Sequence, residues 1–119
     1  MKMFVLLLIS TLSFTSLTAS AKVYLASELA AEVQPIVRIE PRYPAQAARD
    51  GITGYVKLKF IVNEYGSVND VEVIESVPEV IFDRQAIKAV QKWKYKPSIV
   101  DGKAVKVWQE TQLDFRLSQ

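Results

Sequence analysis

The sequence lacks the residues that most often carry chemistry in small proteins. None of its 119 residues is cysteine and none is histidine. The chain therefore has no disulfide and no thiol chemistry, and it lacks both the commonest general base and the commonest metal ligand. Its formal net charge is only +2, too small a basic excess to indicate binding to nucleic acid. We expect no cofactor, no metal site and no nucleic-acid partner.

Catalytic motifs are also missing. The sequence contains no glycine-rich phosphate loop, no nucleophile motif and no metal-ligand spacing. Two pairs of carboxylates are close enough along predicted strands to meet in space: Glu72 with Glu75, and Glu110 with Asp114. A solvated strand face explains both pairs more simply than general acid–base catalysis does. We therefore expect a binding protein and not an enzyme. A secreted hydrolase would require an activity that is lost when a carboxylate is mutated.

The first 21 residues have the layout of a secretory signal peptide. Lys2 supplies a positive start, an apolar stretch runs from Met3 to Leu17, and Ala19-Ser20-Ala21 is a small-x-small site. We predict cleavage after Ala21. The rival interpretation is a retained inner-membrane signal anchor, which needs about 20 strongly apolar residues. Serine and threonine dilute the stretch after Ile9, which favours cleavage.

The next two segments differ in character. Within residues 22–34, Leu25, Leu29 and Val33 recur at i, i+4 and i+8. This spacing would suit a short helix, although a loosely ordered N-terminal tail is an equal alternative. Residues 35–44 contain three prolines, so we expect this segment to be extended without forming a regular strand.

Residues 35–119 are predicted to form one small α+β domain. We expect a short helix at 45–50, strands at 54–62 and 68–76, a helix from Pro78 to about Lys92, and a strand at 104–117. The strands alternate apolar and polar residues. The longer helix carries an apolar stripe, formed by Phe82, Ala86, Ala89, Val90 and Trp93. This order predicts a three-stranded antiparallel sheet with both helices packed on one face.

Such a small sheet has two edges, and an edge strand can accept a peptide as an added strand. The predicted final strand carries Gln109, Thr111 and Gln112 near its middle and contains no proline. Polar side chains there are compatible with an edge that stays soluble until a partner arrives. Charged residues could equally protect the same edge: Lys106, Glu110 and Arg116. The residues alone leave both interpretations open.

Short motifs along residues 35–117 together resemble the TonB C-terminal domain family. They are Pro41-Arg42-Tyr43-Pro44 before an alanine-rich turn, Gly54-x-Val56, Phe60-x-Val62, Gly66-x-Val68, Phe82-Asp83-Arg84 with Ala86, Trp93-x-Tyr95-x-Pro97 and Phe115-x-Leu117. They occur in the family's order and at its spacings. The resemblance implies the family's fold and a role in TonB-dependent transport across the outer membrane.

In that family the domain binds the TonB box, an extended N-terminal segment of an outer-membrane receptor, along the edge of its last strand. The resemblance implies a contact segment formed by Arg38, Ile39, Glu40, Pro41 and Arg42, and an edge formed by the backbone of Val107, Gln109, Thr111 and Leu113. It assigns structural roles to Tyr43, Pro44, Gly54, Phe60, Gly66, Trp93, Tyr95 and Pro97. Glu40 departs from the family, because transducing members can carry glutamine there. An ionised carboxylate cannot donate a hydrogen bond, so we expect a different partner preference.

The N-terminus departs further from the family. Members that transmit force have an uncleaved membrane helix with a functional histidine and a long proline-rich spacer, and this sequence shows neither. We expect a periplasmic module that binds TonB-dependent receptors, working beside a full-length transducer or in competition with it, without coupling to the inner-membrane motor. The alternative is an envelope scaffolding or assembly module with the same fold. An open edge also leaves a strand-exchanged homodimer as an alternative to a monomer.

Overall fold

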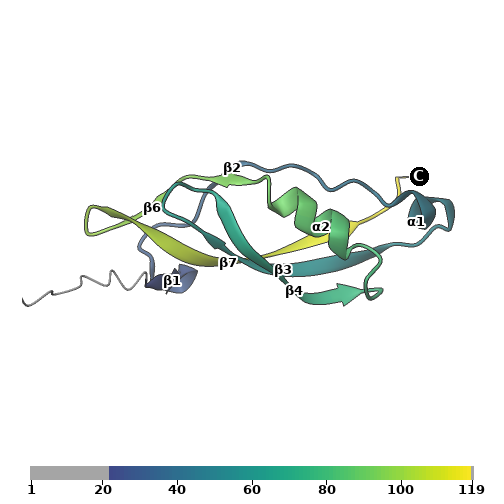
Figure 1. Ribbon diagram of the computed structural model, residues 1–119, viewed down its shortest axis with the longest axis horizontal. Helices are drawn as coiled ribbons and strands as arrows, with labels where there is room; N and C mark the ends of the chain where they lie inside the picture. Colours follow the sequence, from purple (N-terminus) through teal and green to yellow (C-terminus); the bar gives the residue numbers. More distant parts are fainter. Residues whose placement is uncertain (1–21, 119) are drawn as a thin grey trace, which may run out of the picture.

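A long twisted sheet organises the chain (Figure 1). The computed structural model describes residues 22–118, so the predicted signal peptide at 1–21 lies outside the described residues. The main sheet has the strand order β1-β7-β3-β4, and β6 pairs separately with β7. These strands are β1 (Val23–Leu25), β3 (Gly54–Val62), β4 (Val68–Val77), β6 (Ser98–Val100) and β7 (Lys103–Phe115). The β3, β4 and β7 strands are the three predicted, and each pair in contact is antiparallel.

The central strand, β3, shows why the alternating pattern predicted the sheet. The apolar residues at every second position of β3 are all at most 1% exposed: Val56, Leu58, Phe60 and Val62. The alternate position Lys57 is exposed and forms an ion pair with Glu75 on β4. One face of β3 therefore forms the floor of the core, as expected for a half-buried strand.

Both predicted helices cover that face. They are α1 (Ala45–Arg49) and α2 (Asp83–Val90). Ala47 of α1 and Ala86 and Val90 of α2 belong to the same buried cluster as Leu58 of β3. The predicted α+β fold, with two helices on one face of an antiparallel sheet, is confirmed. No helix within residues 22–118 is both long enough and apolar enough to cross a membrane.

The longer helix begins later than predicted. We expected it to start at Pro78, whereas α2 starts at Asp83. Val80 has a φ of 73°, which lies in the left-handed region and cannot continue a right-handed helix. Residues 78–82 therefore form a turn that leads from β4 into α2.

Several short strands were not predicted. The β2 strand (Pro35–Val37) pairs antiparallel with β5 (Lys94–Tyr95) in a second, two-stranded sheet, so the expectation of no strand within 35–44 is wrong at its start. Residues 22–34 contain β1 and the 3-10 helix η1 (Ala26–Glu28) and no α-helix. With β1 and β6 added, the main sheet has five strands instead of three. Strands of three residues are too short to show a period, and their pairing depends on partners distant in the sequence.

Candidate functional site

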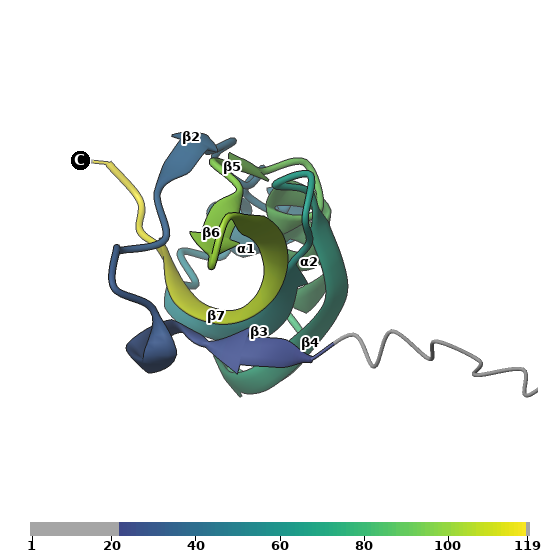
Figure 2. The same cartoon turned by 90° about the vertical axis from the view of Figure 1, so that its left-hand side faces the viewer.

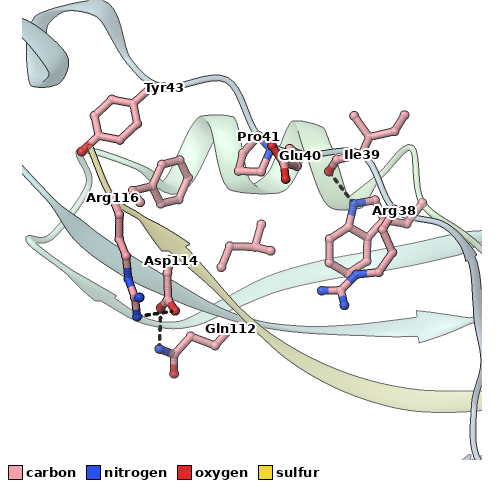
Figure 3. Close-up of a pocket in the computed structure, with 11 residues that line it drawn as sticks. Arg38, Ile39, Glu40, Pro41, Tyr43, Gln112, Asp114 and Arg116 are labelled. Atoms are coloured by element: carbon pink, nitrogen blue, oxygen red, sulfur yellow. Dashed lines mark hydrogen bonds and ion pairs between the residues drawn. The ribbon is translucent and has the colours of Figure 1, made fainter. Parts of the chain in front are cut away.

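A cleft lies between the segment 38–43 and the C-terminal half of β7 (Figure 3). Its volume is about 630 Å³, and it is lined by Arg38, Ile39, Glu40, Pro41, Tyr43, Trp93, Gln112, Leu113, Asp114, Phe115 and Arg116. It brings together four residues of the expected contact segment and Leu113 of the expected edge. Arg42 lines a smaller neighbouring cleft of about 190 Å³. Val107, Gln109 and Thr111 lie further along β7, outside the larger cleft.

Trp93 holds the middle of the segment 38–43 against the core. The indole Nε1–H donates a hydrogen bond to the carbonyl oxygen of Ile39 at 2.8 Å. The Arg38 guanidinium lies 4.4 Å from the centroid of the same ring, within the range of a cation–π interaction. Trp93 itself is only 2% exposed. The residue to which the family motif assigns a structural role thus positions the wall of the cleft.

The upstream end of this segment is fixed by the small sheet. The Lys96 N–H donates to the carbonyl oxygen of Gln34 at 2.9 Å, and the Tyr95 N–H donates to that of Gly66 at 2.8 Å. Gly66 has a φ of +81°, and a Cβ there would lie 1.9 Å from the carbonyl oxygen of Tyr95. Only glycine meets both conditions without moving the backbone. The β5 strand, and with it β2, is therefore seated on the turn that contains Gly66.

The downstream end is fixed by aromatic packing. The Tyr43 hydroxyl donates to the carbonyl oxygen of Ile52. Its ring meets Phe82 edge-on at 5.6 Å and Phe115 edge-on at 5.9 Å, between centroids. Phe82 and Phe115 stack on each other at 4.3 Å. The segment is therefore anchored at both ends and faces the end of β7 across the cleft.

The two edges of β7 have different partners. One edge pairs with β3 in an unbroken register from Val107 to Phe115. The other edge pairs with β1, in parallel, only from Lys106 to Trp108. Since Val107 and Trp108 pair with both strands, β1 and β3 must lie on opposite edges, in agreement with the strand order. We call the edge away from β3 the outer edge. From Gln109 to Phe115 the outer edge has no strand partner within residues 22–118.

Charges of both signs surround the cleft. Arg116 Nη2 lies 3.3 Å from Asp114 Oδ2, and Gln112 Nε2 donates to Asp114 Oδ1 at 2.8 Å. Figure 3 shows both side chains reaching toward Asp114, with Glu40 on the opposite wall. Burial raises the pKa of Tyr95 behind the segment, and the charge of Arg38 partly offsets this rise. The mixed charges suit hydrogen bonding to a peptide better than binding of one strong ion.

Of the carboxylates considered as acid–base candidates, Asp114 lines the cleft, whereas Glu75 of β4 lies outside it. Glu75 accepts a hydrogen bond from the Tyr55 hydroxyl at 2.8 Å and lies 3.4 Å from Lys57 Nζ. The hydrogen bond from Tyr55, followed by the contact with Lys57, lowers the pKa of Glu75. A general acid needs a raised pKa, so this arrangement does not suit one. Among residues 22–118 no group of acidic residues is arranged to hold a metal ion.

Sequence reasoning missed three polar residues of the cleft, namely Gln112, Asp114 and Arg116. Gln112 and Asp114 lie at alternate positions of β7, and Arg116 directly follows the strand. Their spacing at every second position did indicate that their side chains lie on a common face. Their place beside the segment 38–43 depends on the chain's return path through β2 and α1.

Comparisons with known proteins agree with this fold. A family model described as the Gram-negative bacterial TonB protein C-terminal matches residues 39–117. TonB of Pseudomonas aeruginosa is 38% identical over 74 residues, which cover 62% of this chain and 22% of that protein. TonB of Escherichia coli is 34% identical over 84 residues, which cover 70% of this chain and 35% of that protein. The matched region thus spans about a fifth to a third of these relatives' length.

Solved structures give the same result. The solution NMR structure of the Pseudomonas aeruginosa TonB C-terminal domain aligns with a TM-score of 0.64 and 33% sequence identity, covering 73% of this chain and 88% of that one. The TonB2 protein of Vibrio anguillarum aligns with a TM-score of 0.56 and 38% identity, covering 72% of this chain and 82% of that one. The motifs, the fold and the matched residues therefore agree, and the chain belongs to the family of the Gram-negative bacterial TonB protein C-terminal domain.

Proposed function

We propose that this chain is a periplasmic binding module that engages TonB-dependent outer-membrane receptors. In this proposal the TonB box of a receptor adds to the outer edge of β7 as an extra strand. One observation carries the proposal: the outer edge has no strand partner from Gln109 to Phe115 within residues 22–118, and the anchored segment 38–43 faces this stretch across the cleft.

Backbone groups would supply most of the affinity. An edge strand offers N–H and C=O groups that are free to pair, and an extended peptide satisfies them whatever its side chains are. The β7 strand is already held in register by β3. The edge is therefore preorganised, and binding of a partner strand costs no conformational entropy for ordering β7.

The cleft would supply specificity. Alternate side chains of an added strand point to the same face of the sheet, so every second residue of the partner would face the cleft. Leu113 and Pro41 offer apolar surface there, while Glu40, Asp114 and Arg116 offer polar groups. An ionised Glu40 can only accept hydrogen bonds, which favours a partner with an amide, hydroxyl or lysine donor at the matching position.

The proposed role is to support or modulate energy-dependent transport without driving it. The proposal includes cleavage of the signal peptide after Ala21, which would leave a free module in the periplasm. Transmission of force needs an anchor at each end, so a free module would bind receptors beside a full-length transducer or in competition with it. The proposed activity is therefore binding without catalysis.

The test is an NMR titration of isotope-labelled residues 22–119 with TonB-box peptides from the receptors of the same cell. We expect amide shift changes concentrated on residues 109–116 and 38–43. Alternate backbone N–H groups of a strand point to opposite edges, which provides a matched pair of peptides of identical composition. A peptide N-methylated at the amides that face β7 should not bind, and one methylated at the remaining amides should bind.

Other outcomes would redirect the assignment. A well-folded sample that shows no shifts with any receptor peptide would contradict receptor engagement and favour the envelope scaffolding module. Equal binding of the two N-methylated peptides would contradict strand addition. Shifts confined to β4, at the opposite edge of the sheet, would show that the wrong edge has been assigned.

A further inference from the structure

The N-terminal strand β1 occupies part of the edge to which a partner strand would add. Val23, Tyr24 and Leu25 pair in parallel with Lys106, Val107 and Trp108 of β7. Figure 2 shows β1 outside the curve that β7 and β3 make around the core. From residue 106 to residue 115, the outer edge of β7 is therefore divided into a section covered by the chain itself, 106–108, and an uncovered section, 109–115.

Side chains contribute little to holding β1 in place. None of its three residues is buried, and Leu25 is 53% exposed. The polar contacts near it stay within its own segment. Lys22 Nζ lies 3.2 Å from Glu28 Oε2 and 4.3 Å from the Tyr24 ring centroid, and the Leu25 N–H donates to Glu28 Oε1 at 3.3 Å. These contacts shape the segment without attaching it to β7.

The attachment of β1 therefore depends mainly on a backbone ladder of three residues. Exposed ion pairs such as Lys22–Glu28 are worth little, and strands this short are stable only within a larger sheet. By contrast, β3 pairs with the same strand over nine positions, from Gly54 to Val62. Exchange at the outer edge should cost far less free energy than any exchange at the edge shared with β3.

A displaced β1 would remain close to its site. Residues 26–34 connect it to β2, and the ladder between β2 and β5 holds the far end of this connection. A tether of this length keeps the free segment at an effective concentration on the order of millimolar. The strand can therefore return as soon as the edge is vacated.

We propose that β1 is a built-in competitor strand that covers residues 106–108 of the outer edge. Any partner strand that extends from 109–115 onto residues 106–108 must displace it. The inference rests on the proposed function, because it needs a partner strand at this edge. It adds a selection by length. A peptide that pairs only with 109–115 meets no competition, and a longer one competes with β1 for 106–108.

A reversible disulfide provides the test. The register places Val23 opposite Lys106, and directly opposed residues of neighbouring strands lie at a separation that a disulfide spans. The sequence has no cysteine, so the double variant Val23→Cys/Lys106→Cys in the chain as processed by the cell forms one defined bridge. Oxidation locks β1 and reduction releases it in the same protein. The reduced form is therefore the matched control, also for the loss of the Lys106–Glu64 ion pair.

Two TonB-box peptides serve as probes, one that spans only 109–115 and one extended to reach 106. Oxidation should weaken binding of the long peptide by about tenfold, as expected when the competent state becomes rare, and leave the short peptide unaffected. Tyr24→Pro and Leu25→Pro act in the opposite direction. Adjacent N–H groups point to opposite sides of a strand, so at least one of the two prolines removes a ladder hydrogen bond. That variant should bind the long peptide more tightly and lose amide protection at 106–108.

The outcomes separate the two proposals. If the reduced protein binds both peptides and oxidation changes neither affinity, the competitor strand is overturned while receptor binding stands. If both proline variants keep full protection at 106–108, displacement of β1 is overturned without reference to any peptide. If no form of the protein binds either peptide, receptor binding fails and the competitor strand fails with it.

Discussion

The two edges of β7 are built in opposite ways. On one edge, nine residues of β3 pair with β7, and both strands bury side chains in a common core. On the outer edge, three residues of β1 pair with it, and none of them is buried. The same thirteen-residue strand therefore carries a permanent contact on one side and an exchangeable contact on the other.

The stability of this small sheet arises from burial more than from backbone pairing. Backbone ladders of both edges exchange hydrogen bonds with water at modest net gain. Burial distinguishes them, because Phe60, Val107 and Phe115 are removed from water on the face shared by β3 and β7. An edge without burial can be vacated without unfolding the domain, which is what strand addition requires.

Removing a core side chain beneath the edge that β7 shares with β3 should strongly destabilise the domain. Phe60→Ala removes a side chain that is fully buried and lies edge-on to Trp93, with 6.4 Å between ring centroids. We expect a loss of about 3–5 kcal/mol in the free energy of unfolding, measured by urea denaturation. Leu25→Ala on β1 is the matched control and should cost no more than about 0.5 kcal/mol. A cost near 2 kcal/mol for Leu25→Ala would show that β1 belongs to the cooperative core.

A second substitution tests how the cleft wall is seated. Gly66→Ala introduces a Cβ 1.9 Å from the Tyr95 carbonyl oxygen at a φ of +81°. Gly102→Ala introduces one at a φ of +77° with nothing within 4 Å. Both variants bear the left-handed strain of about 1–2 kcal/mol, but only Gly66→Ala must also shift β5. We expect Gly66→Ala to lower the free energy of unfolding by about 2–4 kcal/mol. Equal costs in calorimetry would contradict the close approach.

A smaller effect should separate the cleft wall from the core beneath it. Trp93→Phe keeps an aromatic ring but removes the donor to the Ile39 carbonyl oxygen. We expect a loss of about 1–2 kcal/mol and faster amide exchange in residues 38–41. Trp108→Phe is the matched control, since its ring lies 4.3 Å from Lys59 Nζ and Trp108 does not line the cleft. If both variants loosen 38–41 equally, the indole hydrogen bond does not position the wall.

The sequence predicted the pairing of β7 with β3 far better than the contacts at the outer edge of β7. Buried alternation fixed β3 and β7 to within two residues, because a long buried face imposes a period on the sequence. The three residues of β1 show no period, and their parallel partner lies more than 80 positions away. The Trp93 stripe predicted a core residue, but its bond to Ile39 across 54 positions depends on the folded path. The part of the cleft lining formed by residues 38–41 could therefore be predicted from the sequence, whereas the part formed by Asp114 and Arg116 could not.

Acidification should slightly weaken the pairing of β1 with the outer edge of β7. The hydrogen bond from the Leu25 N–H, followed by the ion pair with Lys22, lowers the pKa of Glu28 from 4.5. Because the folded pKa is depressed, the ionised carboxylate stabilises the segment above pH 4.5, and this contribution is lost as pH falls through the lowered pKa. Amide protection of 106–108 should therefore drop on acidification, by less than about threefold because the pair is exposed.

Amide protection in β3 provides the internal reference for this experiment, since the amides of Leu58 and Phe60 should not follow the same titration. Glu28→Gln keeps an oxygen that can accept from the Leu25 N–H but no longer titrates. The pH response of 106–108 should disappear in this variant. If it persists, another carboxylate controls the segment, and Glu28 does not regulate how readily β1 leaves the outer edge.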